Sequence, residues 1–257
     1  MFHDRSSNLF PGVSSAGRAA VRSALASELG ITDLQIAESV AFSMAMVVRA
    51  ALGLHANQAE IAVLVHDSLP GWIALATARH LINAGSRAQL VEWLPSGTPT
   101  PIFSQLRRPL DVLGTQVRSW DDLIQSGETE SFLSSCHALI CGIDALHRHP
   151  QQDSLCQVLN EHSIPVHSIE LPLGLDPDTG IPAQDTLYAS STLCLGVPLD
   201  GLDAGAEFAG RLYLADISLS SVLIEHLLKL SFPILFAEQP VIQIFPVRDI
   251  PPEDTEP

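Results

Sequence analysis

The chain alternates short apolar runs, rich in β-branched residues, with longer stretches of helical periodicity. The clearest case is the run IAVLV at residues 61–65, which is followed by a helical stretch at 72–84 and a second β-rich run at 88–94. A continuous apolar run of this length, bounded by turn residues, is typical of a strand buried on both faces. Strand, helix and strand in this order predict a right-handed parallel crossover.

The same alternation continues along the rest of the chain. Helical stretches are predicted at residues 14–29, 32–52, 102–113, 153–162 and 219–230, with one or two short helices in 120–135. Strands are predicted near residue 117 and at residues 137–143, 165–171, 191–197, 211–217 and 241–245. This regular alternation predicts the α/β class with a doubly wound, mostly parallel sheet.

Charge and composition exclude several classes of protein. The formal net charge is −16, and Lys229 is the only lysine. An acidic surface repels nucleic-acid phosphates and anionic lipid, so we expect neither nucleic acid nor membrane as a partner. The apolar stretch at 36–54 is interrupted by Glu38 and Arg49 and is interpreted as a core helix. Four cysteines without a C-x-x-C pair, and no visible export signal, predict the cytoplasm.

Ligands of open parallel sheets bind where the strands end at their carboxyl side. The first such loop, residues 66–72, is in position for a phosphate cradle, which needs glycines with bare N–H groups at a helix N-terminus. It contains one glycine, Gly71, whereas Pro70 has no N–H and Asp67 would repel phosphate. Because no G-x-G-x-x-G or Walker motif is present, a plain strand–helix turn is the stronger interpretation.

The loops after the strands at 137–143 and 165–171 carry the other candidate groups. Glu170 ends a buried strand, where burial could raise the pKa of a carboxyl group and make it a base. It could equally be a strand-end residue hydrogen-bonded to neighbouring backbone. The run His147, Arg148 and His149 could contact an anion, or it could form an ordinary polar loop.

The sequence GLDPDTG at residues 174–180 first suggests a calcium loop. It fails the EF-hand pattern because Gly180 stands where an oxygen ligand belongs and no glutamate closes the loop. We interpret it as a tight turn in which aspartate side chains accept bonds from local N–H groups.

Several segments, in order along the chain, resemble one known family. GLDPDTG after Glu170-Leu171-Pro172 resembles D-(I/V)-P-S-G-L-D-x-D-T-G, and TLCLGVPLDGL and GRLYLADI are similar to T-x-T-F-G-x-P-K-x-G-L and G-x-(V/L)-x-(V/L)-A-D-I. ALATARHLINAG resembles the helix that follows the family's phosphate loop, and AES at residues 37–39 matches M-E-N. On these segments the chain is identified as a member of the YjeF N-terminal domain family.

Characterised members of that family epimerise the hydrated nicotinamide ring of damaged NADH and NADPH. The resemblance implies a Rossmann-like, three-layer αβα sandwich, commonly dimeric, with a potassium ion in its site. It places the domain at residues 14–247, after an N-terminal segment at 1–13 and before a disordered acidic tail at 248–257.

The positions of the family's site residues depart from the family pattern. The phosphate loop falls on five residues that keep a single glycine: Leu69, Pro70, Gly71, Trp72 and Ile73. The potassium ligands fall on three residues without a side-chain oxygen: Pro70, Gly142 (with Asp144 close by) and Leu173. The substrate-contacting aspartate becomes Glu170, and the lysine of G-x-P-K becomes Leu199.

These departures lead us to expect a divergent member without standard epimerase activity, with no cofactor and no metal. It would bind a small nucleotide-like molecule or a protein partner through a drier pocket, and it would form a homodimer. The expected pocket also includes four polar residues: Asp144, His147, Arg148 and Asp176. The alternative is an NAD(P)HX epimerase with an altered site, using potassium and Glu170 as the base. An unrelated α/β hydrolase is disfavoured because no G-x-S-x-G elbow is present.

Overall fold

The computed structural model describes residues 1–93, 98–149 and 151–247, which build one ten-stranded sheet. The spatial order of its strands is β2-β1-β10-β9-β8-β7-β6-β3-β4-β5. In chain order the strands are β1 (Phe2–Asp4), β2 (Leu9–Phe10), β3 (Glu60–Val65), β4 (Arg87–Glu92), β5 (Gln116–Ser119), β6 (Ala138–Gly142), β7 (Val166–Ile169), β8 (Ser191–Leu195), β9 (Arg211–Ala215) and β10 (Val241–Pro246).

The strands from β9 to β5 run parallel to one another, and β10, β1 and β2 continue the sheet in antiparallel pairing. Each parallel connection passes through helix or long loop, as parallel pairing requires. The doubly wound, mostly parallel sheet expected from the sequence is confirmed.

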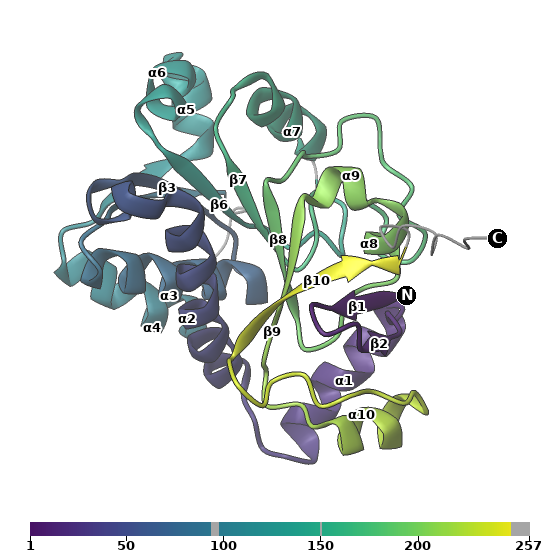
Figure 1. The fold of residues 1–257 in the computed structure, drawn as a ribbon. Coiled ribbons are helices and arrows are strands. Elements are labelled where there is room, and N and C mark those ends of the chain that lie inside the picture. The colour runs from purple at the N-terminus through teal and green to yellow at the C-terminus, as the bar shows by residue number, and fades with distance from the viewer. Residues whose placement is uncertain (94–97, 150, 248–257) are drawn as a thin grey trace.

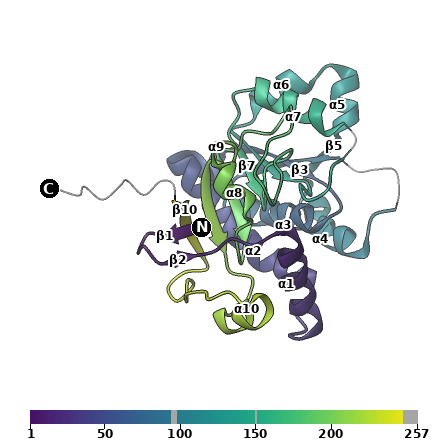
Figure 2. The same ribbon diagram turned by 90° about the vertical axis from the view of Figure 1, so that its right-hand side faces the viewer.

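Helices cover both faces of this sheet (Figures 1 and 2). In chain order the helices are α1 (Ser15–Ser27), α2 (Asp33–Leu52), α3 (Leu69–Asn83), α4 (Pro101–Val112), α5 (Trp120–Ser126), α6 (Thr129–Ser135), α7 (Gln152–Glu161), α8 (Gly201–Ala204), α9 (Ala206–Ala209) and α10 (Ser221–Leu228), with a 3-10 turn, η1 (Gly53–Gln58), after α2. One hydrophobic core joins the sheet to α1–α4 and α10, and a second joins it to α5–α7.

Strand β3 shows how the sequence produces the two cores. Ile61, Val63 and Val65 point into the core under α2 and α3, and Ala62 and Leu64 point into the core under α5–α7. Side chains alternate between the faces of a strand, so a run that is apolar at every position is buried on both sides. The three-layer αβα sandwich follows from this pattern.

Helix α2 is the long apolar helix predicted from the sequence. Its N-terminus is fixed by a capping box in which the Thr32 hydroxyl accepts from Gln35 N and the Gln35 side chain accepts from Thr32 N. By length and composition, the stretch Asp33–Gln58 could also cross a membrane, but half of its most apolar window is buried in the protein. A helix in the core of a globular protein has these properties.

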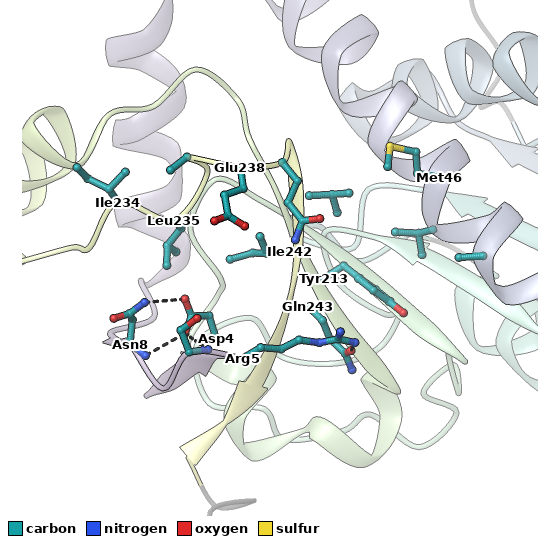
Figure 3. Close-up of a pocket in the computed structure, with 16 residues that line it drawn as sticks. Asp4, Arg5, Asn8, Met46, Tyr213, Ile234, Leu235, Glu238, Ile242 and Gln243 are labelled. Carbon is teal, nitrogen blue, oxygen red and sulfur yellow. Dashed lines mark hydrogen bonds between the residues drawn. The ribbon is translucent and has the colours of Figure 1, made fainter.

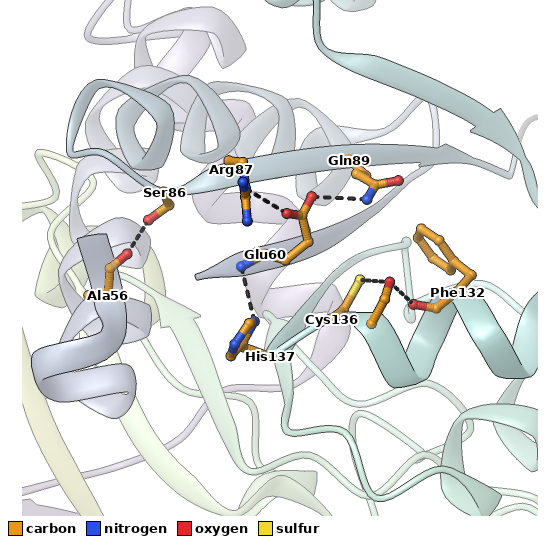
Figure 4. Close-up of polar contacts among 9 residues, drawn as sticks. Ala56, Glu60, Ser86, Arg87, Gln89, Phe132, Cys136 and His137 are labelled. Carbon is orange, nitrogen blue, oxygen red and sulfur yellow. Dashed lines mark hydrogen bonds and ion pairs between the residues drawn. The ribbon is translucent and has the colours of Figure 1, made fainter. Parts of the chain in front are cut away.

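The amino ends of β3, β4 and β6 are joined by polar contacts (Figure 4). The Glu60 carboxylate accepts bonds from Arg87 Nε at 2.8 Å and from Gln89 Nε2 at 2.9 Å. His137 Nδ1 accepts a bond from Glu60 N at 3.1 Å. These groups bond one another across neighbouring strands, so their role at this end of the sheet is structural.

The ends of the chain differ from the predicted organisation. Residues 1–13, expected to precede the domain, contribute β1 and β2 to its sheet, and Phe2 and Phe10 pack in its core. The hairpin escaped prediction because its strands have only three and two residues. The acidic tail predicted at 248–257 lies outside the described residues.

Candidate functional site

The strand order reverses between β3 and β6, which makes this point of the sheet the expected place for a ligand. Strand β3 pairs with β4 on one side and with β6 on the other. The chain therefore leaves β3 toward one face and β6 toward the other, and a crevice opens between the two loops in folds of this kind. Here the two loops run from His66 and from Ile143.

The glycines at this point serve close packing of α3 on the sheet. A Cβ atom on Gly71 would lie 1.7 Å from the carbonyl oxygen of His66, and one on Gly142 would lie 2.5 Å from the Cβ of Ala74. The first turn of α3 thus rests directly on the ends of β3 and β6. All five predicted phosphate-loop residues are buried there: Leu69, Pro70, Gly71, Trp72 and Ile73. At these glycines the missing side chain thus makes room for packing of α3 on the sheet.

Asp67 holds the start of α3 against the start of α4. Its carboxylate accepts bonds from Trp72 Nε1 at 2.8 Å, from Thr100 N at 2.7 Å and from Thr100 Oγ1 at 2.7 Å. Thr100 is itself the N-cap of α4. Asp67 therefore fixes two helices and the ring of Trp72.

A cluster of three rings lies beside Asp67. The ring centroids of His66 and His149 are 4.7 Å apart, and Trp93 lies 5.3 Å from His149 and 6.2 Å from His66. Burial, followed by the nearby His149, lowers the pKa of His66 from its ordinary value of 6.5. The shift favours the neutral imidazole of His66.

The loop after β6 satisfies its own polar groups. The Asp144 carboxylate accepts from Leu146 N at 2.9 Å and contacts His147 Nδ1 at 2.9 Å, and the guanidinium of Arg148 pairs with Asp153. Asp144 thus closes a local turn. Of the three polar residues predicted here, Asp144 and His147 contact each other, whereas Arg148 pairs with Asp153 of α7.

Glu170 occupies the end of β7 in an unusual conformation. Its φ is +72°, a left-handed value that is uncommon for a residue with a side chain. Glu170 Oε1 accepts a bond from Arg18 Nε at 2.6 Å, and the two side chains are only 8% and 4% exposed. The candidate base is therefore enclosed and paired with a guanidinium, and its catalytic role stays a prediction.

Arg18 is the site residue that sequence reasoning missed. It comes from α1, in phase with Val21 and Leu25, so it lies on the face of α1 that turns toward the protein. A charged residue in the apolar phase of a helix is the signal that could have identified it. One turn later, Arg22 binds Asp33 in two bonds of 2.9 and 2.8 Å.

The turn GLDPDTG anchors the start of α1. Asp176 Oδ1 accepts bonds from Asp178 N and from the backbone and hydroxyl of Thr179, and these bonds lower the pKa of Asp176. The predicted tight turn is confirmed. The Asp178 carboxylate in turn accepts from Ser15 N and Ser15 Oγ.

The N-terminal segment also covers the position of the family's lysine. Val13 N donates to Pro198 O at 2.9 Å, and Val13 forms a parallel bridge with Leu199. Leu199 and Leu173 are both buried among apolar side chains. The segment that leads into α1 thus lies along the carboxyl end of the sheet.

The three positions implied for potassium do not fit the ion. Pro70, Gly142 and Leu173 supply no side-chain oxygen, and Leu173 is fully buried. A hard alkali cation binds oxygen ligands. Among the residues that the structure describes, no group of three His, Cys, Asp or Glu side chains could hold a metal ion.

Four cavities in the described residues lie away from the predicted site. One of about 400 Å³ is lined by Met46 and Ala50 of α2, Tyr213 of β9, Ile242 of β10 and the segment 234–239 (Figure 3). A second, also about 400 Å³, lies beside α10, and two more lie near the amino ends of β4 and β5. None of the four is lined by a residue of the predicted site.

A family model described as YjeF-related protein N-terminus matches residues 33–201. Among solved structures, the yeast protein ynu0 (YNL200c) superposes with a TM-score of 0.76 at 20% identity, covering 91% of this chain and 99% of that chain. A dipicolinate synthase from Bacillus halodurans gives a TM-score of 0.34 at 19% identity, covering 54% of this chain and 40% of its own. A comparison with curated proteins gives no match.

Proposed function

This chain belongs to the YjeF-related N-terminal family, and we propose that it is a divergent member that works as a binding module without standard epimerase activity. The buried ion pair between Arg18 and Glu170 is the observation that carries the proposal. It occupies the one carboxylate that the family resemblance offers as a base.

A general base has to come within hydrogen-bond reach of the proton that it removes. Glu170 Oε1 is already within 2.6 Å of a guanidinium nitrogen, under a helix that closes over it. A proton donor that approaches Glu170 Oε1 would have to displace Arg18 first. The charged partner would then be left buried without its counter-ion, which costs several kcal/mol, on the order of 3–5.

The charges of the protein also do not favour binding of a dinucleotide phosphate. Arginines near the carboxyl end of the sheet are each bound to a carboxylate: Arg18 to Glu170, Arg107 to Glu92 and Arg148 to Asp153. The net charge of −16 adds a long-range repulsion for a diphosphate. We therefore propose no dinucleotide cofactor and no potassium ion.

The second candidate is an NAD(P)HX epimerase with an altered site. Its support is the strained backbone of Glu170 together with Arg18, a cation that could take over from the lysine replaced by Leu199. Strain of this kind is concentrated at functional sites in many proteins. In this case potassium and NAD(P)HX would be the ligands, and α1 would move on binding.

An epimerisation assay with NADPHX, in which the two epimers are separated chromatographically, tests the proposal. We expect the wild-type protein, at micromolar concentration and with potassium present, to leave the rate of epimer exchange at its uncatalysed value. Catalysis by the wild-type protein that is lost in Glu170→Gln would establish the second candidate. Chromatography of the substrate before protein is added checks that both epimers are intact, and a yeast ynu0 sample assayed in parallel shows whether that relative accelerates the exchange.

A binding module needs a surface, and the exposed face of α2 supplies one. Leu54, which is fully exposed, lies just beyond the end of α2 in η1. Within α2, Phe42 is 52% exposed and Met46 is 40% exposed, and with Ala50 they repeat every four residues. This spacing forms one ridge on the helix. The ridge borders the 400 Å³ cavity, whose lining includes Met46, Tyr213 and Leu235 (Figure 3).

We propose that this face binds a second copy of the chain. Between residues 39 and 54 its exposed side chains carry one charge, that of Arg49, although the protein as a whole is strongly acidic. A surface that binds a basic partner would be expected to carry acidic residues. A surface that binds a second copy of this acidic chain has to lack them, because like charges would repel each other. In a two-fold contact each ridge would lie beside the cavity of the other copy.

The free cysteines suit the cytoplasm, which we propose as the location. All four cysteines are unpaired, and Cys141, Cys156 and Cys194 are buried. Burial raises the pKa of Cys141 and Cys156 to about 12, so these thiols stay protonated and unreactive. Unpaired thiols are typical of reducing compartments.

A further inference from the structure

The Arg18–Glu170 pair differs from the other ion pairs of the described residues in its burial. Its side chains are 4% and 8% exposed, whereas every other arginine–carboxylate pair in the described ranges has a partner exposed by more than a fifth. Two charges removed from water are costly unless each finds a well-placed counter-charge. The carboxylate of Glu170 is therefore a strong point of attraction for a cation.

The backbone holds this carboxylate in place. Glu170 N donates to Leu193 O at 2.8 Å and Leu171 N donates to Ile169 O at 3.0 Å, which fixes the turn that ends β7. Cys194 lies close enough for Glu170 to raise its pKa further above the ordinary value. The result is a buried carboxylate next to Cys194, held in place by the strand ends.

The guanidinium that pairs with Glu170 is incompletely hydrogen-bonded. Arg18 Nη1 is buried and has no hydrogen-bond partner among the described residues. A buried donor without an acceptor is unfavourable, because it has lost its bonds to water without replacement. Arg18 arrives on a helix whose other anchors lie elsewhere, at Ser15 with Asp178 and at Arg22 with Asp33.

We propose that Glu170 is the recognition group of a site for guanidinium and primary ammonium cations, and that Arg18 is its built-in occupant. The inference rests on the proposed function, because it makes Glu170 a binding carboxylate instead of a base. A ligand from outside has to carry such a cation and take the place of Arg18. The acidic surface raises the local concentration of cationic molecules, which favours this class of ligand.

Chemical rescue of Arg18→Ala tests the site with methylguanidinium as the probe. The variant leaves Glu170 buried without a counter-ion, and we expect its Tm to fall by roughly 10 °C. Millimolar methylguanidinium chloride should restore more than half of this loss in a saturable manner. Urea, a neutral molecule of similar shape, and sodium chloride at matched ionic strength should not.

Two further variants make the rescue specific. Arg22→Ala removes an arginine from the same helix whose pair with Asp33 is exposed, and methylguanidinium should leave its Tm unchanged. Arg18→Ala combined with Glu170→Gln should also show no rescue. If Arg18→Ala does not fold, Arg18→Lys places an ammonium near the same carboxylate and should retain most of the stability of the wild type.

Hydrogen–deuterium exchange of the wild-type protein tests whether an added cation displaces Arg18 from Glu170. Hydrogen–deuterium exchange of the α1 amides should speed up at saturating methylguanidinium, while that of the α2 amides should not. Equal rescue by urea, rescue that survives Glu170→Gln, or unchanged exchange of α1 would each overturn the proposal. The NADPHX assay is independent of all three, so failure here leaves the proposed loss of epimerase activity standing.

Discussion

At the scale of single residues, the same amino acid can be explained by two different roles. Gly71 stands where the family resemblance places a phosphate-loop glycine, yet its missing side chain makes room for the carbonyl of His66. Glu170 stands where the resemblance places a substrate-contacting acid, yet it binds Arg18. The sequence shows which amino acids stand at positions 71 and 170. It does not show what each of them contacts, because both contacts form only when the helices pack on the ends of the strands.

Gly71→Ala tests the packing role of this glycine. The added methyl group would overlap the His66 carbonyl oxygen, so α3 must shift away from the end of β3. We expect a loss of about 3 kcal/mol in the free energy of unfolding, measured by urea denaturation. Gly17→Ala in α1, whose new Cβ would meet only ordinary contacts, should be neutral or stabilising. Equal stability of the two variants would contradict the close packing of α3.

His167 gives the protein a defined loss of stability in acid. Burial lowers its pKa to about 4, whereas an unfolded histidine binds its proton near pH 6.5. Between these values the unfolded chain holds more protons, so the free energy of unfolding decreases as the pH falls from 6.5 to 4. The contribution is on the order of 3 kcal/mol.

His167→Asn removes this titration and keeps a group that can bond to Ser191, the present partner of His167 Nδ1. Thermal or urea denaturation at several pH values should show that, below pH 6.5, the free energy of unfolding falls less steeply with decreasing pH for the variant than for the wild type. Parallel curves for variant and wild type over that interval would rule out the buried neutral histidine.

At the scale of elements, the helices and strands with strong periodicity were predicted from the sequence, and their arrangement over the site was not. The helix predicted at 14–29 is α1, but nothing in its own pattern says that it lies across the carboxyl end of the sheet. That position comes from contacts with residues more than 150 positions away: Asp178, Leu199 and Glu170. Long-range pairing of this kind is outside the reach of local sequence patterns.

Met46→Glu tests the proposed role of α2 as a self-contact. The change adds a charge to the centre of the exposed ridge, and a two-fold contact would bring two such charges together. We expect the wild-type protein to sediment as a dimer at micromolar concentration. Added salt should stabilise this dimer, because it screens the repulsion between the two acidic copies. The Met46→Glu variant should sediment as a monomer.

Val112→Glu is a matched control, since Val112 is an exposed apolar residue at the end of α4. It should leave the dimer intact. A wild-type monomer at these concentrations, or a dimer that survives Met46→Glu, would remove α2 as the contact face.

At the scale of the whole molecule, family membership fixes the architecture and leaves the chemistry open. The sheet, the helices and the order of the segments that resemble the family match its fold, and the yeast relative superposes over nearly its full length. At the carboxyl end of the sheet, α3 packs on the strand ends, Arg18 of α1 pairs with Glu170, and Arg148 pairs with Asp153. We propose that these contacts close the site. The replacements at Pro70, Leu173 and Leu199 led us to expect a change of chemistry, whereas these contacts became visible only in the three-dimensional arrangement.

Titration calorimetry of the wild-type protein with NADPH, NADP and ADP-ribose, each with and without potassium, tests this closure most directly. A filled site and paired arginines predict no saturable heat for any of the three up to millimolar concentration. Saturable binding of one of them in the micromolar range, strengthened by potassium and weakened by Gly71→Ala, would contradict it.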